Sequence, residues 1–199
     1  SHFVQQRIKK YYRRESTVIN PPVDIEKFSF SDLEDRVEKK FYLAVGAFVP
    51  YKRFDMLLSA FNRLDKKLVI AGDGPLARKL QAQAGSNVTI IVNPSDQKLR
   101  ALMLEAKAFI FPMVEDFGIT AVEAISAGVP LIAYEKGGAL DFVEEGVNGI
   151  FFKEATTESL CAAIEHFEKL SFDTDQIKAS VQKFHKKEFQ EKMKKQIDN

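Results

Sequence analysis

The sequence has no tryptophan, a single cysteine and almost no net charge. Its 199 residues carry 29 Lys and Arg against 28 Asp and Glu, which leaves a formal charge of +1. A chain without an excess of positive charge is not built to bind a polyanion over its whole surface, so nucleic acid is not an expected partner. The lone Cys161 cannot form a disulfide within the chain, which excludes a disulfide-stapled scaffold and favours a reducing, cytoplasmic location.

Long hydrophobic runs are absent as well. Residues 108–114 form one of the longest uninterrupted apolar stretches, far below the roughly 20 residues that cross a bilayer. The first residues, Ser1 to Ile8, lack the charged-then-apolar order of a secretion signal. We therefore expect neither a membrane-spanning helix nor export, and we expect a further segment to precede Ser1.

What the sequence does contain, from residue 41 onward, is a regular alternation of short apolar runs with longer segments of helical spacing. Most runs are continuous rather than interleaved with polar residues, as expected when helices cover both faces of a sheet. The pattern predicts an α/β fold, a doubly wound, Rossmann-like parallel sheet that binds ligands at the carboxyl ends of its strands. The expected strands are 41–47, 67–71, 88–92, 108–113, 130–134 and 150–152, and the expected helices are 54–63, 75–84, 97–106, 119–127, 139–144 and 158–170.

The expected helix boundaries rest on capping chemistry. Proline suits a first helical position, a side-chain oxygen suits the position before a helix, and glycine suits the left-handed position after it. These signals are Pro75 at the start of the second helix, Ser95 and Asp96 before the third, Gly128 after the fourth, and Thr156 and Thr157 before the sixth.

The two ends of the chain differ from this alternating core. The paired prolines of Asn20-Pro21-Pro22-Val23-Asp24 force extended, linker-like backbone. We assign residues 1–28 to a lead-in helix and interdomain linker, 29–172 to the Rossmann-like domain, and 173–199 to a polar C-terminal helix with its helical residues at 173–197. Acidic residues interrupt the lysines of that helix, which predicts a solvated face, with a membrane-surface or phosphate-binding role as the alternative.

The most informative segment follows the fourth expected strand. It places Glu115 in the loop, Gly118 at a helix start and Glu123 in the second helical turn. The first-turn amides have no intrahelical partner and carry the positive end of the helix dipole, so a diphosphate can dock at Gly118, Ile119 and Thr120. Because carboxylates accept hydrogen bonds from hydroxyls, the pattern fits a nucleotide-sugar, with the sugar near Glu115 and the ribose near Glu123. The alternative is a solvated loop residue and a helix-surface residue.

A second group of candidate residues follows the first expected strand. Gly46 permits a close approach of backbone, and Lys52 and Arg53 stand just before a helix at the same edge of the sheet. Two cations at this position can neutralise a diphosphate leaving group, whereas the alternative is an exposed pair without function. The two groups support each other because both follow the carboxyl ends of strands.

Other motifs point elsewhere. The segment 72–77 reads G-x-G-x-x-A between a strand and a helix, which is typical of nicotinamide-dependent oxidoreductases, but no acidic residue ends the following strand. We interpret it as a turn and helix cap near the ligand. Asp173-Thr174-Asp175 has the D-x-D pattern of a metal site, and helix capping is its simpler explanation. The three histidines have no metal-ligand spacing.

These residues together resemble the donor-binding domain of family-four retaining glycosyltransferases, which have the two-domain GT-B fold. The resemblance covers nearly the whole chain. It rests on Glu115-x7-Glu123 with Phe117-Gly118 inside it, on Ala127-Gly128-Val129-Pro130-Leu131-Ile132-Ala133, and on Gly137-Gly138. It continues with 20–24 as the interdomain segment, 50–53 as the phosphate-binding loop, and 72–75 as the second-strand turn.

The resemblance implies a role for each candidate residue. It implies that Lys52, with Arg53, binds the diphosphate, that Glu115 and the backbone of 117–119 hold the sugar and phosphate, that Glu123 binds the ribose, and that the base lies against 93–96. The implied catalytic residues are Lys52 and Glu115, and the implied donor-binding residues are Gly46, Arg53, Asn93, Pro94, Phe117, Gly118, Ile119, Thr120 and Glu123.

The resemblance also implies a reaction and its partners. The sequences Pro-Tyr-Lys-Arg at 50–53 and Glu-Asp-Phe-Gly-Ile at 115–119 are similar to mannosyltransferases of polysaccharide and O-antigen synthesis. They imply transfer of a hexose, mannose from GDP-mannose, by front-face attack and without a metal or other cofactor. A missing N-terminal domain is expected to bind the saccharide or lipid-linked acceptor, and a lipid-linked acceptor implies peripheral contact of the full-length protein with the inner membrane face. This chain is then the donor-binding half, expected to bind donor but turn over little alone.

Two residues depart from the family pattern. The family usually has arginine directly after the first-strand glycine, where this chain has Ala47, and glycine where this chain has Val92. A missing arginine removes one cation from the diphosphate clamp, a loss of about 1.5 to 3 kcal/mol if it made a charge-assisted hydrogen bond. The alternative function is therefore a catalytically inactive nucleotide-sugar-binding or interaction domain.

Overall fold

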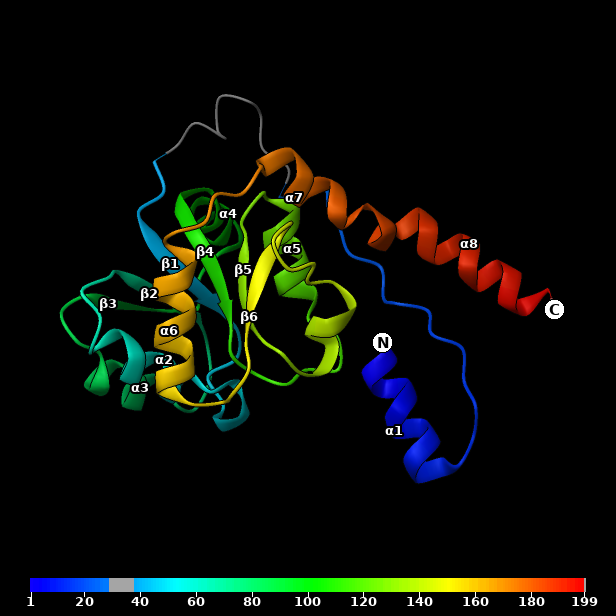
Figure 1. The fold of residues 1–199 in the computed structure, drawn as a ribbon, viewed down its shortest axis with the longest axis horizontal. Coiled ribbons are helices and arrows are strands. Elements are labelled where there is room, and N and C mark those ends of the chain that lie inside the picture. Colours follow the sequence, from blue (N-terminus) through cyan, green and yellow to red (C-terminus); the bar gives the residue numbers. More distant parts are fainter. Residues whose placement is uncertain (29–37, 199) are drawn as a thin grey trace.

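A computed structural model describes residues 1–28 and 38–198. Its centre is one sheet of six parallel strands in the order β3-β2-β1-β4-β5-β6 (Figure 1). All six expected strands are present, so the doubly wound, Rossmann-like α/β fold is confirmed. The strands are β1 Phe41–Val45, β2 Leu68–Gly72, β3 Val88–Val92, β4 Ala106–Phe111, β5 Leu131–Tyr134 and β6 Gly149–Phe152.

Helices cover both faces of this sheet, which explains why the central strands are continuous apolar runs. Helices α2, α3 and α6 lie over one face and α4 and α5 over the other (Figure 1). Residues such as Leu43, Ile70 and Ile132 are fully buried between these layers. The bounds are α2 Phe54–Phe61, α3 Ala77–Gln83, α4 Asp96–Glu105, α5 Ile119–Ser126 and α6 Thr157–Phe167.

Most of the expected caps are confirmed. The side chains of Ser95 and Thr156 accept hydrogen bonds from backbone N–H groups in the first turns of α4 and α6. Gly128 follows α5 with φ of 77°, as the left-handed position requires. The assignment of Pro75 was wrong, because α3 begins two residues later, at Ala77.

The segment expected as a helix at 139–144 is instead a short 3-10 helix, Gly137–Asp141. A buried side chain ends it. The Asn148 amide donates to the Phe142 carbonyl at 2.9 Å, and its oxygen accepts from the Glu144 N–H at 2.8 Å. These bonds satisfy backbone groups that a longer helix would have paired internally.

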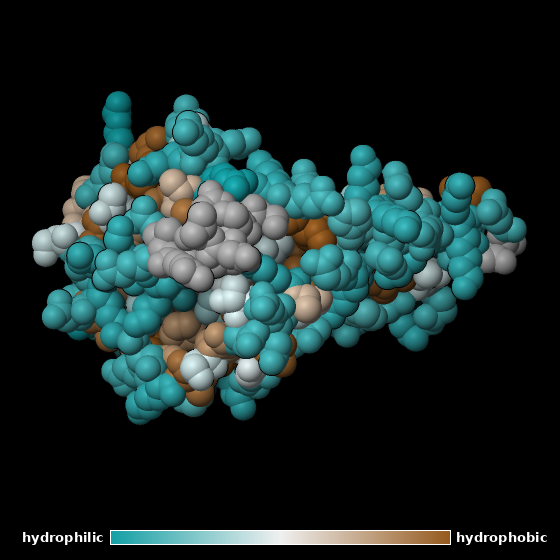
Figure 2. Space-filling model, turned by 90° about the horizontal axis from the view of Figure 1, so that it is seen from above, coloured by the Kyte–Doolittle hydropathy of each residue, from teal (hydrophilic) through white to brown (hydrophobic). Residues whose placement is uncertain are grey.

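The prediction of a single polar helix over 173–197 was also wrong. The structure has α7 Thr174–Ser180, a 3-10 helix Gln182–Phe184 and α8 Lys186–Ile197. The break lies where the chain turns inward to bury Phe184 and to pair His185 with Val23 in a parallel bridge. Asp173 caps α7 through its side chain, as expected. Helix α8 buries none of its residues, and Figure 2 shows a mostly hydrophilic surface at that end of the molecule.

The N-terminal segment begins with the expected lead-in helix, α1 His2–Tyr12, which stands apart from the sheet in Figure 1. The expected domain boundary, between residues 28 and 29, borders residues 29–37, which lie outside the described residues. The three-part division of the chain therefore stays a prediction. None of the helices within 1–28 and 38–198 combines the length and apolar character that a bilayer span requires.

A charged cluster joins the end of α6 to the amino-terminal ends of β1, β2 and β4. The Glu168 carboxylate accepts hydrogen bonds from the buried Tyr42 hydroxyl, from Lys107 at 2.7 Å and from Lys66 at 3.2 Å. Burial alone would raise the pKa of Glu168, but these hydrogen bonds outweigh it and lower the pKa to about 2. The cluster therefore stabilises the fold only while Glu168 is ionised.

We expect Glu168→Gln to lower the free energy of unfolding at pH 7 by about 1 to 2 kcal/mol, the value for a charged hydrogen-bond acceptor reduced for partial exposure. The side chain is 26% exposed. Because the folded-state pKa is depressed, the stabilisation is complete above the unfolded pKa near 4.5 and disappears as pH falls toward 2. Urea denaturation at pH 7 and pH 3 measures this difference, and Glu165→Gln, exposed on the same helix, is the control. An equal difference in unfolding free energy between variant and wild type at pH 7 and pH 3 would contradict this prediction.

Candidate functional site

A cavity of about 270 Å³ opens between the carboxyl ends of β1 and β4. These neighbouring strands are the point where the strand order reverses, and open α/β sheets place ligands in the crevice at that point. Both strands contribute the last residues of their runs to its wall. The cavity is lined by Pro21, Val45, Lys52, Phe111, Glu115, Phe117, Gly118, Ile119 and Thr120.

The β1 side of the cavity supplies a cation. The 3-10 helix Pro50–Lys52 places Lys52 over Gly46, where an added Cβ would lie 3.5 Å from the Lys52 Cε atom. The Lys52 ammonium donates a hydrogen bond to Glu115 Oε1 across the cavity. The two side chains are only 15% and 21% exposed, so water screens this ion pair less than it screens a surface pair.

The β4 side supplies the carboxylate and the start of a helix. The Glu115 carbonyl accepts from the Gly138 N–H at 2.8 Å, which fixes the backbone of the loop. Gly118 has φ of 121°, and a Cβ there would lie 2.7 Å from the ring of Phe111. The turn into α5 therefore requires glycine for both its conformation and its packing. The ring of Phe117 packs on Phe142, which anchors the loop on the core.

The amino-terminal end of α5 faces the cavity. The first bonds within the helix are donated by Ala121 and Val122 to the Gly118 carbonyl. The N–H groups of Ile119 and Thr120 precede them and, by helix geometry, point out of the helix start. They add the positive end of the helix dipole to the charge of Lys52, which makes this wall of the cavity suited to an anion.

Glu123 lies one turn further along α5 and outside the lining of the cavity. Burial raises its pKa; the charge of Lys27 lowers it, and the charges of Asp24 and Asp96 raise it further. Lys27 is itself paired with Asp96 at 3.2 Å. The charged groups that act on Glu123 are therefore those of Asp24, Lys27 and Asp96, and none of them lines the cavity.

The remaining predicted residues lie at the same sheet edge but do not line the cavity. Arg53 has left-handed backbone with φ of 56°, and its guanidinium pairs with Asp55 at 3.5 Å. Asn93 also has positive φ, and its N–H donates to the Gly72 carbonyl at 2.8 Å. Asn93 and Pro94 follow β3, three strand spacings or about 14 Å from the end of β4. Their roles, like that of Arg53, stay predictions.

The sequence did not predict that the N-terminal segment contacts the site. Pro21 forms part of the cavity wall, and the proline pair within the linker was the signal available for it. Asp141, 4% exposed, accepts from the His2 N–H at 3.0 Å and from the Asn20 amide at 2.9 Å. No pattern in the sequence indicates these contacts, because their partners are more than 100 residues apart.

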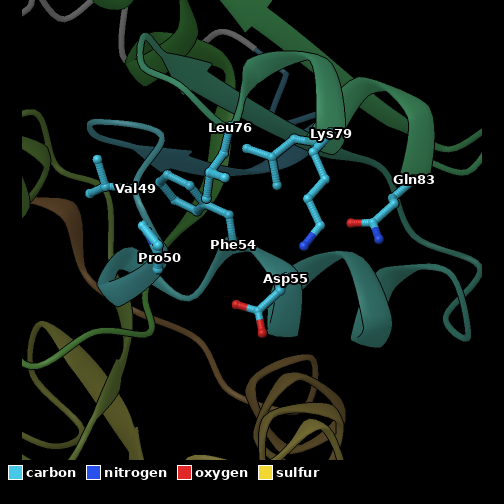
Figure 3. A pocket seen from close by; sticks show the side chains of 8 residues that line it. Val49, Pro50, Phe54, Asp55, Leu76, Lys79 and Gln83 are labelled. Carbon is cyan, nitrogen blue, oxygen red and sulfur yellow. The ribbon is translucent and has the colours of Figure 1, made fainter.

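A second cavity, of about 210 Å³, lies behind the loop that carries Lys52. Figure 3 shows its apolar wall, with Phe54 beside Leu76, and the polar ends of Lys79, Gln83 and Asp55 on one side. The wall is mainly apolar, and the start of α2 that reaches it carries Asp55, whose negative charge opposes an anion. It therefore lacks the features that suit the first cavity to a diphosphate.

Within residues 1–28 and 38–198, no group of three or more His, Cys, Asp or Glu side chains is gathered as metal ligands would be. Chemically, the first cavity joins an anion-binding wall to a carboxylate that accepts hydrogen bonds from hydroxyl groups. A ligand that carries a diphosphate next to a sugar matches both halves.

Comparison with known proteins identifies the family of the chain. The family profile described as glycosyl transferases group 1 matches residues 25–196. The O-antigen chain mannosyltransferase C of Escherichia coli is 30% identical over 80% of this chain and 46% of its own length. The D-rhamnosyltransferase WbpZ of Pseudomonas aeruginosa is 31% identical over 72% of this chain and 41% of its own length. The chain thus spans less than half the length of these two relatives.

Solved structures show the same fold. Anabaena HepE in complex with UDP and glucose superposes with a TM-score of 0.76 at 21% identity, covering 92% of this chain and 56% of HepE. At that identity the likeness establishes the fold alone. The family profile covers most of the chain, and this chain therefore belongs to the group 1 glycosyltransferases.

Proposed function

We propose that this chain is the donor-binding half of a retaining glycosyltransferase that transfers a hexose, mannose from GDP-mannose, to a saccharide or lipid-linked acceptor. The observation that carries the proposal is the pairing of Lys52 with Glu115 beneath the start of α5, at the switch point of the sheet. The acceptor domain lies outside this chain, and contact of the full-length protein with the inner membrane face belongs to the same proposal.

The chemistry follows from the charges around the cavity. When the bond between the sugar and the diphosphate breaks, negative charge develops on the leaving phosphate oxygen. Lys52 and the N–H groups of Ile119 and Thr120 stabilise this charge without a metal ion. Glu115 orients the sugar by accepting hydrogen bonds from its hydroxyls. The acceptor hydroxyl attacks from the face that the diphosphate leaves; its oxygen forms the new bond to the sugar, and its proton passes to the leaving phosphate oxygen.

The choice of mannose rests on the relatives and on the 50–53 and 115–119 sequences. A mannosyltransferase and a rhamnosyltransferase are among the relatives, and HepE was solved with UDP and glucose. The relatives therefore share sugar transfer but differ in the sugar, and mannose and guanine are the more specific part of the proposal. In this proposal Glu123 and the 93–96 loop provide the ribose and base contacts, as the resemblance implies, and the charge of Asp96 in that loop acts on Glu123.

Calorimetric titration of the chain with GDP, UDP and ADP, followed by their sugars, tests the proposal. We expect GDP-mannose to bind more tightly than UDP-glucose or ADP-glucose, and a chelator such as EDTA to leave that binding unchanged. Tighter binding of a UDP-sugar would change the proposed donor but leave the proposed transferase activity standing. Absence of binding for all of the nucleotides at millimolar concentration would reject the donor site.

A second candidate function is a catalytically inactive nucleotide-sugar-binding domain. Ala47 favours it, because the family usually places an arginine there and the diphosphate clamp has one cation fewer. The two functions differ in turnover, so donor binding without transfer by the full-length protein, measured with a panel of acceptors, would favour the second.

A further inference from the structure

The two charged side chains that line the cavity are paired with each other. Lys52 comes from the loop after β1 and Glu115 from the loop after β4, and their ion pair bridges the space in which a diphosphate would lie. The pair is mostly shielded from water, so the attraction between the two charges exceeds that of a surface pair. Any anion that requires Lys52 must therefore compete with Glu115 for it.

The outcome of this competition depends on what else the ligand carries. A free nucleoside diphosphate takes the Lys52 ammonium and leaves the Glu115 carboxylate without its partner, beside a second negative group. Both the lost partner and the repulsion between like charges cost free energy. A nucleotide-sugar instead brings hydroxyl groups, which donate hydrogen bonds to the carboxylate and replace the ammonium.

The structure indicates which of the two side chains moves. The Glu115 backbone is held by the Gly138 N–H, and the following turn is fixed by Gly118 against Phe111. The Lys52 stem lies over the bare backbone of Gly46, and its ammonium, while paired with Glu115, already lies 5.4 Å from the centroid of the Tyr51 ring. Lys52 has the longer, more flexible stem and Glu115 the more firmly held backbone, so we expect Lys52 to be the side chain that turns from the carboxylate to the phosphate.

We propose that Glu115 is a specificity-determining residue that favours the sugar-bearing nucleotide over the free nucleoside diphosphate, because it releases Lys52 at low cost only when sugar hydroxyls take its place. This inference rests on the proposed function and adds a selection step to it. After transfer the product has no sugar hydroxyls, so Glu115 recaptures Lys52 and promotes release of the diphosphate.

The test compares Glu115→Gln with Asp116→Asn, which removes the same charge from the next residue of the same loop. Asp116 is 65% exposed and pairs with Arg7 instead of Lys52. Calorimetry with GDP and GDP-mannose gives four dissociation constants for the variants and two for the wild type. We expect Glu115→Gln to bind GDP about tenfold more tightly and GDP-mannose about tenfold more weakly, and Asp116→Asn to change either by less than about twofold.

The outcomes separate the inference from the function on which it rests. Weaker binding of both ligands to Glu115→Gln, or equal effects of the two variants, would overturn the inference and leave the donor site standing. Absence of GDP and GDP-mannose binding to the wild type, repeated with UDP and UDP-glucose, would remove the donor site and the inference with it. Thermal unfolding checks that each variant is folded, and Glu115→Ala replaces the Gln variant if that one is not.

Discussion

Replacing Lys52 by methionine is expected to weaken binding of both GDP and GDP-mannose by about 10- to 100-fold, the loss of one charge-assisted hydrogen bond to a phosphate. Methionine keeps most of the stem that packs over Gly46 and removes only the charged end. The loss applies to both ligands because both carry the diphosphate. It also leaves Glu115 unpaired at the cavity wall, which adds repulsion toward the incoming anion.

Lys79→Met is the matched control for this prediction. Lys79 lines the neighbouring apolar cavity, so the substitution removes the same charge at a site that the diphosphate does not touch. We expect it to change either dissociation constant by less than about twofold, because exposed charges act weakly beyond one Debye length. Equal losses in the two variants would mean that overall positive charge, rather than contact with Lys52, attracts the nucleotide.

The fold was predictable from the sequence where local signals and tertiary packing agree. Each strand is a short apolar run buried under helices on both faces, so hydrophobicity alone identifies it. The polar C-terminal segment shows the opposite case. Its lysine-rich sequence favours one continuous helix, but the bridge between Val23 and His185 and the burial of Phe184 break it. Contacts between residues more than 150 positions apart leave no periodic signal in either segment.

For the candidate site, the sequence predicted which strand ends carry the residues but not the contacts between their side chains. Lys52 and Glu115 follow strands that the doubly wound topology places side by side, and the structure brings them together. The ion pair itself was not predicted, because it depends on side-chain rotamers. Arg53 illustrates the same limit, since its guanidinium turns to the neighbouring Asp55. The proximity of Lys27 to Glu123 depends on how the linker lies over the sheet edge, which no local pattern describes.

The glycines that resemble a dinucleotide-binding motif have a structural role that requires no ligand. An added Cβ at Gly72 would lie 1.9 Å from the Gly46 carbonyl oxygen and 3.0 Å from the ring of Phe48. The nearest obstacle is backbone, and hydrogen bonds from Gly46 to Ala71 and from Phe48 to Asp73 hold the two segments together. The turn after β2 thereby supports the loop that carries Lys52.

We therefore expect Gly72→Ala to lower the free energy of unfolding by about 3 kcal/mol, at the upper end of the cost of overpacking. In a chain of this size the loss lowers the melting temperature by about 6 to 12 °C. Calorimetric melting measures it without any nucleotide present. Because the loop after β1 must shift to relieve the clash, the variant should also bind GDP more weakly than the wild type when both are measured well below their melting temperatures.

Gly146→Ala separates the clash from the general effect of replacing a glycine. Gly146 has φ of 79°, and a Cβ there meets no atom within 4 Å, so that variant experiences backbone strain of about 1 kcal/mol and no overlap. A Gly72→Ala protein that melts like the wild type would show that the two loops separate easily. The proposal that the β2 turn supports Lys52 would then be wrong. If the same variant also lost affinity for NAD, a direct ligand contact at Gly72, as in a nicotinamide-dependent oxidoreductase, would better explain the glycine.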